Sequence, residues 1–245
     1  MPFQVEYTNS PQGIETVFAA NVVGHFTLIN LLLPLLEKTA EQYGDARVAL
    51  ASSSPHAGCQ ELNFDLLISP EPVKTPREID SCWRYCRSKL GVILITREFA
   101  RRLDKKGVDK VFVNTYFPGN IPTDAMTPWK EMFGPFGAML KGAFQFIGQS
   151  LKDASATAIY LATSPEVVQK NEKGLYFIPI GTEDTKNTTP IARDDDLARN
   201  LWAWCDDKVT KTLGKGWMND GEGAASSAAG QAAIEPKVFD YVPKA

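Results

Sequence analysis

Apolar residues recur at helical spacing over a long stretch near the start of the chain. From Gly13 to Lys38 they fall three or four positions apart, which predicts a long helix with a wide apolar face. Pro34 lies inside this stretch and should bend or end the helix near its last turn. A second stretch, 78–104, carries an apolar stripe and gathers Arg and Lys at its C-terminal end, where the helix dipole favours positive charge. The pattern therefore predicts two long helices.

Short apolar runs between the helical stretches predict buried strands. They are RVALASS at 47–53, the run at 110–116, and GLYFIPIG at 174–181. Further helices are expected at 153–163 and 194–213. Helices that alternate with strands are typical of an α/β fold with a parallel sheet.

Three other segments have a less regular pattern. Residues 54–77 hold several prolines and should form a long loop of the kind that is usually functional. Residues 128–150 are rich in Phe, Met and Gly. The segment GEGAASSAAGQAA at 221–233 cannot bury a core and reads as a flexible linker. We therefore expect one α/β domain at 1–213, followed by a linker and tail at 214–245.

Composition narrows the range of functions. The chain has 245 residues, 44% of them hydrophobic, and a net charge of −3, so nothing favours a nucleic-acid partner. The apolar stretch FTLINLLLPLL is shorter than the roughly 20 residues of a membrane span. With no signal peptide in view, we expect a cytoplasmic protein without a stable span. No metal site is expected, because no second pair or nearby histidine completes a ligand set around the scattered cysteines, Cys59, Cys82, Cys86 and Cys205.

The stretch YCRSK offers candidate chemistry. It sets Tyr85 and Lys89 four residues apart, on one face of the second long helix. A nearby ammonium should lower the pKa of a tyrosine towards neutrality, as a general acid–base at a carbonyl or alcohol requires. An ordinary helix can carry the same pair. However, Ser53 ends one strand and Pro118–Gly119 follows the next, and carboxyl ends of parallel strands gather at one edge.

Taken in order, these pieces resemble the short-chain dehydrogenase/reductase family. AANVVGHFTLINLLLPLL is similar to the family's asparagine helix, RVALASSS to its serine strand, and YCRSKLGVILITREFARRL to its YxxxK helix. VFVNTYFPGNIPTD resembles the Pro-Gly turn, and GLYFIPIG resembles the last core strand. The sequence of these segments is most similar to the retinol-dehydrogenase-like branch of the family, especially its fungal members. The resemblance covers about residues 13–213.

The resemblance implies a role for each matching residue. Tyr85 would donate or accept the proton, and Lys89 would lower its pKa and hold the nicotinamide ribose. Ser53 would orient the substrate carbonyl, and Asn21 would support a water-linked proton relay behind Lys89. Each residue also has a structural interpretation: Asn21 as a helix-packing amide and Ser53 as a strand-end cap.

Neighbouring residues compete for some of these roles. Ser52 and Ser54 flank Ser53, which we prefer because the family motif places the catalytic hydroxyl second in the Ser-Ser pair. His25 falls in a segment where the family's histidine is structural, and His56 follows the serine strand, at the expected mouth of the site. Neither histidine is our candidate for the base.

The implied cofactor is NAD or NADP, with Lys89, Pro118, Gly119 and Thr123 bordering the nicotinamide. The family begins with a TGxxxGIG turn that holds the pyrophosphate on a helix N-terminus, and the chain contains no such motif. Of the family's sheet order, 3-2-1-4-5-6-7, only the last three strands are recognisable. We therefore expect the C-terminal part of a doubly wound, Rossmann-like sheet without its nucleotide-binding half. Three explanations account for the missing half: the sequence is a gene fragment, the protein is a truncated paralogue, or a partner chain supplies that half. We favour the first, because the active-site residues are retained.

Two functions follow. The first is an NAD(P)-dependent oxidoreductase acting on an alcohol or ketone, with 128–150 as a lid over a lipophilic substrate or, equally, as a core helix. Without the nucleotide-binding half, this chain alone would be an incomplete and inactive enzyme. The second is a non-catalytic truncated paralogue that dimerises with an intact relative through helices 13–38 and 78–104.

Overall fold

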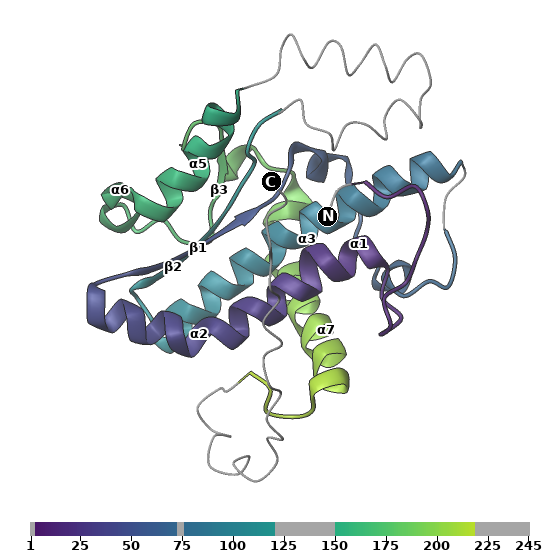
Figure 1. Ribbon diagram of the computed structural model, residues 1–245, viewed down its shortest axis with the longest axis horizontal. Helices are drawn as coiled ribbons and strands as arrows, with labels where there is room; N and C mark the ends of the chain where they lie inside the picture. The colour runs from purple at the N-terminus through teal and green to yellow at the C-terminus, as the bar shows by residue number, and fades with distance from the viewer. Residues whose placement is uncertain (1–2, 73–75, 121–149, 219–245) are drawn as a thin grey trace, which may run out of the picture.

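The computed structural model of the chain describes residues 3–72, 76–120 and 150–218. In these residues, helices pack on both faces of a central sheet (Figure 1). The fold is α/β, as the sequence predicts. The expected linker at 221–233 and nearly all of the apolar segment at 128–150 lie outside the described residues.

The sheet has the strand order β1-β2-β3-β4. β1 (Ala46–Ala51), β2 (Val111–Tyr116) and β3 (Tyr176–Ile178) run parallel, which confirms the predicted parallel sheet. β4 (Thr182–Glu183) is a short antiparallel strand beside β3, which the sequence pattern did not indicate. Within the described residues β1 forms one end of the sheet. The carboxyl ends of β1 and β2 therefore open onto the same edge.

The first long helix runs without a break through three elements: α1 (Thr16–Phe18), the π-helical turn η1 (Ala19–Val23) and α2 (Gly24–Tyr43). Of the two effects predicted for Pro34, an end of the helix is not found, because the helix continues to Tyr43, and a bend stays a prediction. Proline removes one backbone hydrogen bond, but the next turns still bury apolar side chains, down to Ala40 at 2% exposure. Tertiary packing thus outweighs the local cost of the proline.

The π-helical turn η1 has a visible effect on side-chain spacing. Phe18, Val22 and Phe26 are all fully buried at successive steps of four residues. In an ordinary α-helix two such steps drift by about 80° around the axis. The wider π turn absorbs this drift and keeps the three side chains on one face.

The second long helix, α3 (Arg77–Lys106), crosses the same face of the sheet as α2 (Figure 1). It ends at Gly107, whose φ of 73° closes the helix in the left-handed conformation that glycine adopts easily. α7 (Asp195–Leu213) packs on α3 and inserts Trp202 into the shared core. The centre of the Trp202 ring lies 4.7 Å from that of the Phe26 ring and 5.8 Å from that of the Phe99 ring. This side holds the main core.

The opposite face of the sheet is covered by α5 (Leu151–Thr163) and α6 (Pro165–Gln169) (Figure 1). Ser150 and Ser164 cap their N-termini by accepting backbone N–H groups. The core on this side is smaller and consists of Phe112, Leu161, Val167 and Phe177.

Short 3₁₀ helices occupy much of the remaining chain. The predicted loop at 54–77 contains η2 (Ser54–Gly58) and η3 (Phe64–Leu67). The other two, η5 (Thr185–Asn187) and η6 (Pro190–Arg193), lie between β4 and α7. η2 packs against α3, so this part of the loop borders the helix that carries the YxxxK residues.

Ordered structure continues past Leu213, the last residue of the predicted domain. Trp217 is buried, and its Nε1–H is placed to donate to Asp206 Oδ1 at 2.9 Å or Thr210 Oγ1 at 3.1 Å. Its ring also lies 5.6 Å from the ring of Phe26. The first residues after α7 are therefore part of the folded unit.

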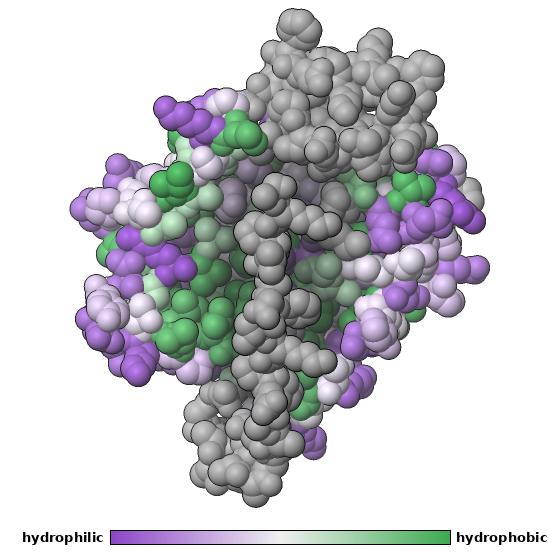
Figure 2. All heavy atoms as spheres, in the orientation of Figure 1, coloured by the Kyte–Doolittle hydropathy of each residue, from purple (hydrophilic) through white to green (hydrophobic). Residues whose placement is uncertain are grey.

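One helix in the described residues is long and apolar enough to cross a membrane. This is Thr16–Tyr43, with a mean hydropathy of 1.6 in its most apolar window, of which 39% is buried. A core helix of a soluble protein passes the same test, and α2 does bury one face. Its other face is apolar surface, seen in green in Figure 2, where four leucines are 39–59% exposed: Leu28, Leu31, Leu32 and Leu35.

Candidate active site

Tyr85 and Ser53 meet at the carboxyl edge of the sheet. Tyr85 lies on α3, and Ser53 lies between the end of β1 and the start of η2. Their side chains are joined by a hydrogen bond. Burial raises the pKa of Tyr85 above its usual value, and the hydrogen bond with Ser53 opposes this rise. The phenol is therefore protonated at neutral pH.

Lys89 lies one turn further along α3. Its Nζ donates to the backbone carbonyl of Ala51 at 3.0 Å and lies 5.6 Å from the ring centre of Tyr85. Burial lowers the pKa of Lys89 to about 8. The lowered tyrosine pKa expected from the YxxxK spacing is not found, because burial dominates over charge in this part of the structure. Lys89 faces the strand end more closely than the phenol.

Asn21 reaches this site through a serine. It lies in the π-helical turn, and its Nδ2 donates to Ser88 Oγ at 3.0 Å. Ser88 Oγ in turn donates to the backbone carbonyl of Tyr85 at 2.8 Å. The carbonyl of Asn21 accepts the Nδ1–H of His25 at 2.8 Å. Asn21 therefore ties the first helix to the residue that precedes Lys89.

The local geometry distinguishes the three candidate serines. Ser52 is buried, and its hydroxyl donates to the backbone carbonyl of Lys89 at 2.8 Å. Ser54 is exposed and begins η2. Only Ser53 bonds to the phenol of Tyr85 among the three. Ser53 is therefore the serine placed beside Tyr85, and its role as the substrate-orienting hydroxyl stays a prediction.

His56 holds the turn that carries Ser53. Its Nδ1–H donates to the Ser53 carbonyl at 2.8 Å, and its ring lies 5.1 Å from that of Tyr176. The side chain is only 5% exposed, and burial lowers its pKa. His56 therefore lies beneath the site, rather than at its mouth as expected from the sequence.

Pro118 and Gly119 follow β2 at the same edge. The strand end is fixed by Phe117, whose N–H donates to the carbonyl of Phe177 at 2.8 Å. Gly119 has a φ of 105°, a backbone conformation that glycine adopts easily. Thr123, the last predicted cofactor residue, lies outside the described residues.

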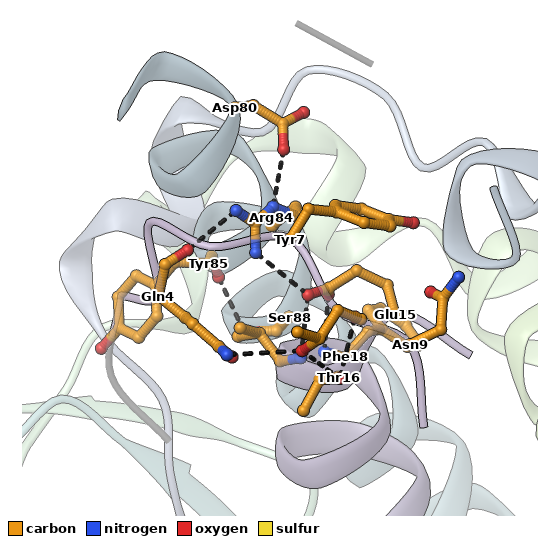
Figure 3. Close-up of polar contacts among 12 residues, drawn as sticks. Gln4, Tyr7, Asn9, Glu15, Thr16, Phe18, Asp80, Arg84, Tyr85 and Ser88 are labelled. Carbon is orange, nitrogen blue, oxygen red and sulfur yellow. Dashed lines mark hydrogen bonds and ion pairs between the residues drawn. The ribbon is translucent and has the colours of Figure 1, made fainter. Parts of the chain in front are cut away.

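Sequence reasoning missed residues that surround Tyr85 on its other side. Phe3 stacks on the Tyr85 ring, with the ring centres 4.2 Å apart. Arg84, next to Tyr85 in sequence, is buried between Asp80 and Glu15 (Figure 3). Glu15 caps α1, a role that its residue type does not signal, because the usual capping residues are Ser, Thr, Asp and Asn. Asp80 is a local partner, but no local pattern signals the burial of Arg84, because Glu15 and the carbonyl groups that it also binds are distant in sequence.

The cysteines near the site are neutral. Cys59 and Cys86 lie close to each other below η2, and burial raises their pKa values to about 11 and about 12. Across 3–72, 76–120 and 150–218, no group of three or more His, Cys, Asp or Glu residues could hold a metal ion.

Comparison with curated proteins finds homologues of this chain. The chain is homologous to the short-chain dehydrogenases/reductases, as the ordered segments predict. It is 34% identical to human retinol dehydrogenase 14 over 204 residues, which are 82% of this chain and 54% of the relative. It is 32% identical to the chloroplastic short-chain dehydrogenase TIC 32 A of Brassica napus, covering 82% and 58%.

A fungal relative also matches. A short chain dehydrogenase/reductase from Colletotrichum higginsianum is 33% identical, over 80% of this chain and 49% of the relative. The chain thus spans about half the length of the curated relatives it matches. No family model matches the chain.

A solved structure supports the fold. It is an uncharacterized protein from Mycobacterium paratuberculosis, with a TM-score of 0.57 and 21% identity, covering 85% of this chain and 64% of that one. This likeness concerns the fold alone.

Proposed function

We propose that this chain carries the catalytic residues of an NAD(P)-dependent oxidoreductase that acts on an alcohol or ketone of a lipophilic small molecule. One observation carries the proposal. The phenol of Tyr85 is hydrogen-bonded to Ser53 at the carboxyl edge of the parallel sheet, where ligands of open α/β sheets bind. The relatives' names, retinol dehydrogenase and short-chain dehydrogenase, are consistent with this activity.

The residues suit proton transfer at a carbonyl oxygen. The raised pKa of Tyr85 keeps its hydroxyl protonated, so that it can donate to a ketone oxygen during reduction. Ser53 would donate a second hydrogen bond to the same oxygen and fix its position. Lys89, with a pKa near 8, can carry a proton or release it close to neutral pH. Asn21 supports this edge from behind through Ser88.

The same edge fits the nicotinamide end of a dinucleotide. One N–H of Lys89 bonds to Ala51, and an ammonium offers two more donors for ribose hydroxyls. Pro118 and Gly119 would border the ring, with Thr123 beyond them. When bound, the cofactor would supply or accept the hydride. The seat of the pyrophosphate remains part of the proposal, since the chain has no TGxxxGIG motif.

The test begins with cofactor binding. NADPH and NADH are titrated separately against the full chain, followed by turnover with retinaldehyde and with an aliphatic ketone as probes. In Tyr85→Phe, turnover should fall by about 10²–10⁴-fold, because the general acid is lost. Tyr43→Phe is the matched control, since Tyr43 is 74% exposed at the end of α2 and should leave turnover unchanged. Full activity of Tyr85→Phe would contradict the proposal.

A second candidate function rests on the exposed leucines of α2. The non-catalytic paralogue would use this helix, part of the predicted 13–38 surface, to bind an intact relative. Size-exclusion chromatography with a full-length relative tests it, and Leu31→Asp with Leu35→Asp should abolish any complex. The Ser53–Tyr85 hydrogen bond favours the catalytic proposal, because a purely structural module does not need it.

Location in the cell is proposed to be cytoplasmic. The apolar helix Thr16–Tyr43 makes this testable. Recovery of the chain in the membrane fraction after a carbonate wash would contradict the proposal.

A further inference from the structure

Arg84 is the centre of a buried network next to the candidate active site (Figure 3). The side chain is only 2% exposed. Its Nε donates to Asp80 Oδ2 at 2.7 Å, and its Nη1 donates to Glu15 Oε1 at 3.3 Å. Its Nη2 donates to the backbone carbonyls of Gln4 at 2.8 Å and Val5 at 3.2 Å. Every guanidinium nitrogen therefore has a partner.

The two carboxylates are themselves fixed. Glu15 is 2% exposed and caps α1, accepting the N–H groups of Val17 and Phe18, both at 2.9 Å. Asp80 lies one turn before Arg84 on α3 and is 1% exposed. A buried guanidinium held by two fixed carboxylates has little freedom to move. Arg84 is thus a rigid anchor on α3.

The anchored partner is the N-terminal segment, residues 3–9. Besides the bonds to Gln4 and Val5, the guanidinium lies over the ring of Tyr7 at 5.3 Å. Tyr7 in turn donates its hydroxyl to the carbonyl of Ser69 at 2.6 Å. The segment is therefore attached on both sides, and these attachments place Phe3 on the ring of Tyr85.

Phe3 and Tyr85 form a close aromatic pair. Their ring centres are 4.2 Å apart and their planes are inclined by 36°. Both side chains are partly exposed. A group hydrogen-bonded to the Tyr85 hydroxyl must lie within about 3 Å of that oxygen. The substituents of such a group would pass close to the Phe3 ring.

From these contacts we propose that Phe3 is a substrate-contacting, specificity-determining residue, and that Arg84 is the positioning residue that holds Phe3 against Tyr85. The proposal rests on the proposed oxidoreductase function of Tyr85. Phe3 forms an apolar wall beside the reacting oxygen. It favours substrates whose carbonyl or alcohol carbon bears a flat or branched apolar group.

The first experiment measures the surroundings of Tyr85 without using activity. The full chain is labelled with [¹³Cζ]tyrosine, and the Tyr85 resonance is assigned by its loss in Tyr85→Phe. Phe3→Ala should shift this resonance and lower its titration midpoint, because the phenol becomes more solvated. Phe3→Tyr should restore both values, since it restores the ring. An unchanged resonance in Phe3→Ala would overturn the placement of Phe3.

A second variant tests the role of Arg84. Arg84→Lys keeps the charge but cannot reach two carboxylates and two carbonyls from one nitrogen. It should move the Tyr85 resonance in the same direction as Phe3→Ala, and the double variant should add nothing further. Arg101→Lys is the matched control, because Arg101 also binds a carboxylate on α3 but lies several turns away. Additive effects of the two substitutions would overturn the coupling.

Turnover then separates this inference from the proposed function. Phe3→Ala should raise KM several-fold for a bulky apolar ketone, with little change in KM for a small ketone and with kcat largely retained. A lower KM in Phe3→Ala would show that Phe3 blocks the site and would overturn the specificity role. If Tyr85→Phe stays fully active while the resonance shifts occur as expected, the proposed function fails and the packing arrangement stands.

Discussion

Arg84 and Tyr85 are adjacent on α3, yet their surroundings differ in kind. Arg84 is fully buried, and its hydrogen bonds are made to fixed carboxylates and carbonyls. Tyr85 is partly exposed, has one side-chain hydrogen bond to Ser53, and has a shifted pKa. Its companion Lys89 makes one described hydrogen bond and has a lowered pKa. All guanidinium nitrogens of Arg84 are thus hydrogen-bonded, whereas Tyr85 and Lys89 keep hydrogen-bonding capacity that a ligand could use.

The difference separates structural from chemical roles. A buried ionic group with every donor paired contributes to the position of its neighbours, and its removal leaves the partners unpaired. A partly exposed group with a shifted pKa and spare hydrogen-bonding capacity can respond to a ligand. Substitutions on the two sides should therefore affect different measurable properties.

The largest effect is expected from Arg84→Ala. It leaves the buried carboxylates of Asp80 and Glu15 without their cation, which should lower the free energy of unfolding by about 3–5 kcal/mol. Urea denaturation measures the loss. In the control Arg101→Ala, Glu98 keeps its ion pair with Arg102 at 2.7 Å, so the loss should be only about 0–1 kcal/mol. Equal losses in the two variants would remove the contrast.

Unlike Arg84→Ala, the substitution Lys89→Met should cause little loss of stability. Burial penalises the ammonium in the folded state, so below pH about 8 the charged Lys89 lowers the free energy of unfolding of the wild type. This penalty is relieved as the pH rises from about 8 to 10.5, and the wild type gains stability over that range. The variant lacks this gain. Near pH 7 we expect Lys89→Met to match or exceed the wild type, by on the order of 1 kcal/mol. Parallel stability curves between pH 7 and 10.5 would contradict the lowered pKa.

The smallest effect is expected at His56, which supports Ser53 from below. Its pKa is lowered because burial opposes the charged form. The neutral ring is therefore compatible with the fold above pH about 6.5, and stability should fall as acid protonates it below that value. His56→Gln should lose this dependence. Urea denaturation from pH 5 to 7.5 compares the two proteins, and identical slopes would indicate that His56 does not titrate on unfolding.

Much of the fold could be predicted from the sequence because its signals are local. The period of apolar residues gave both long helices, and the short apolar runs gave the parallel strands. The order of strand, helix and turn brought Ser53, Tyr85 and Lys89 to one edge, which the structure confirms. Residue spacing and strand direction are sufficient for these inferences, since they need no knowledge of distant partners.

The failures share a different cause. The helix passes Pro34 because distant core residues hold its later turns. The pKa of Tyr85 rises rather than falls because burial depends on packing from several segments. Arg84 became an anchor through contacts with Gln4 and Glu15, far from it in sequence. Long-range burial decided each of these cases, and a periodic pattern does not report it.

The π-helical turn at Ala19–Val23 has a consequence for how this helix can tolerate change in length. One residue corresponds to about 100° of rotation in an α-helix. Deleting a single residue from this turn would leave seven steps of ordinary winding from Phe18 to Phe26, a rotation of about 700°, which is within about 20° of two full turns. Phe26 would therefore stay on the buried face, and an outward leucine such as Leu28 would stay exposed. The widened turn thus holds one extra residue, in the segment presenting Asn21, without changing which face of α2 is buried.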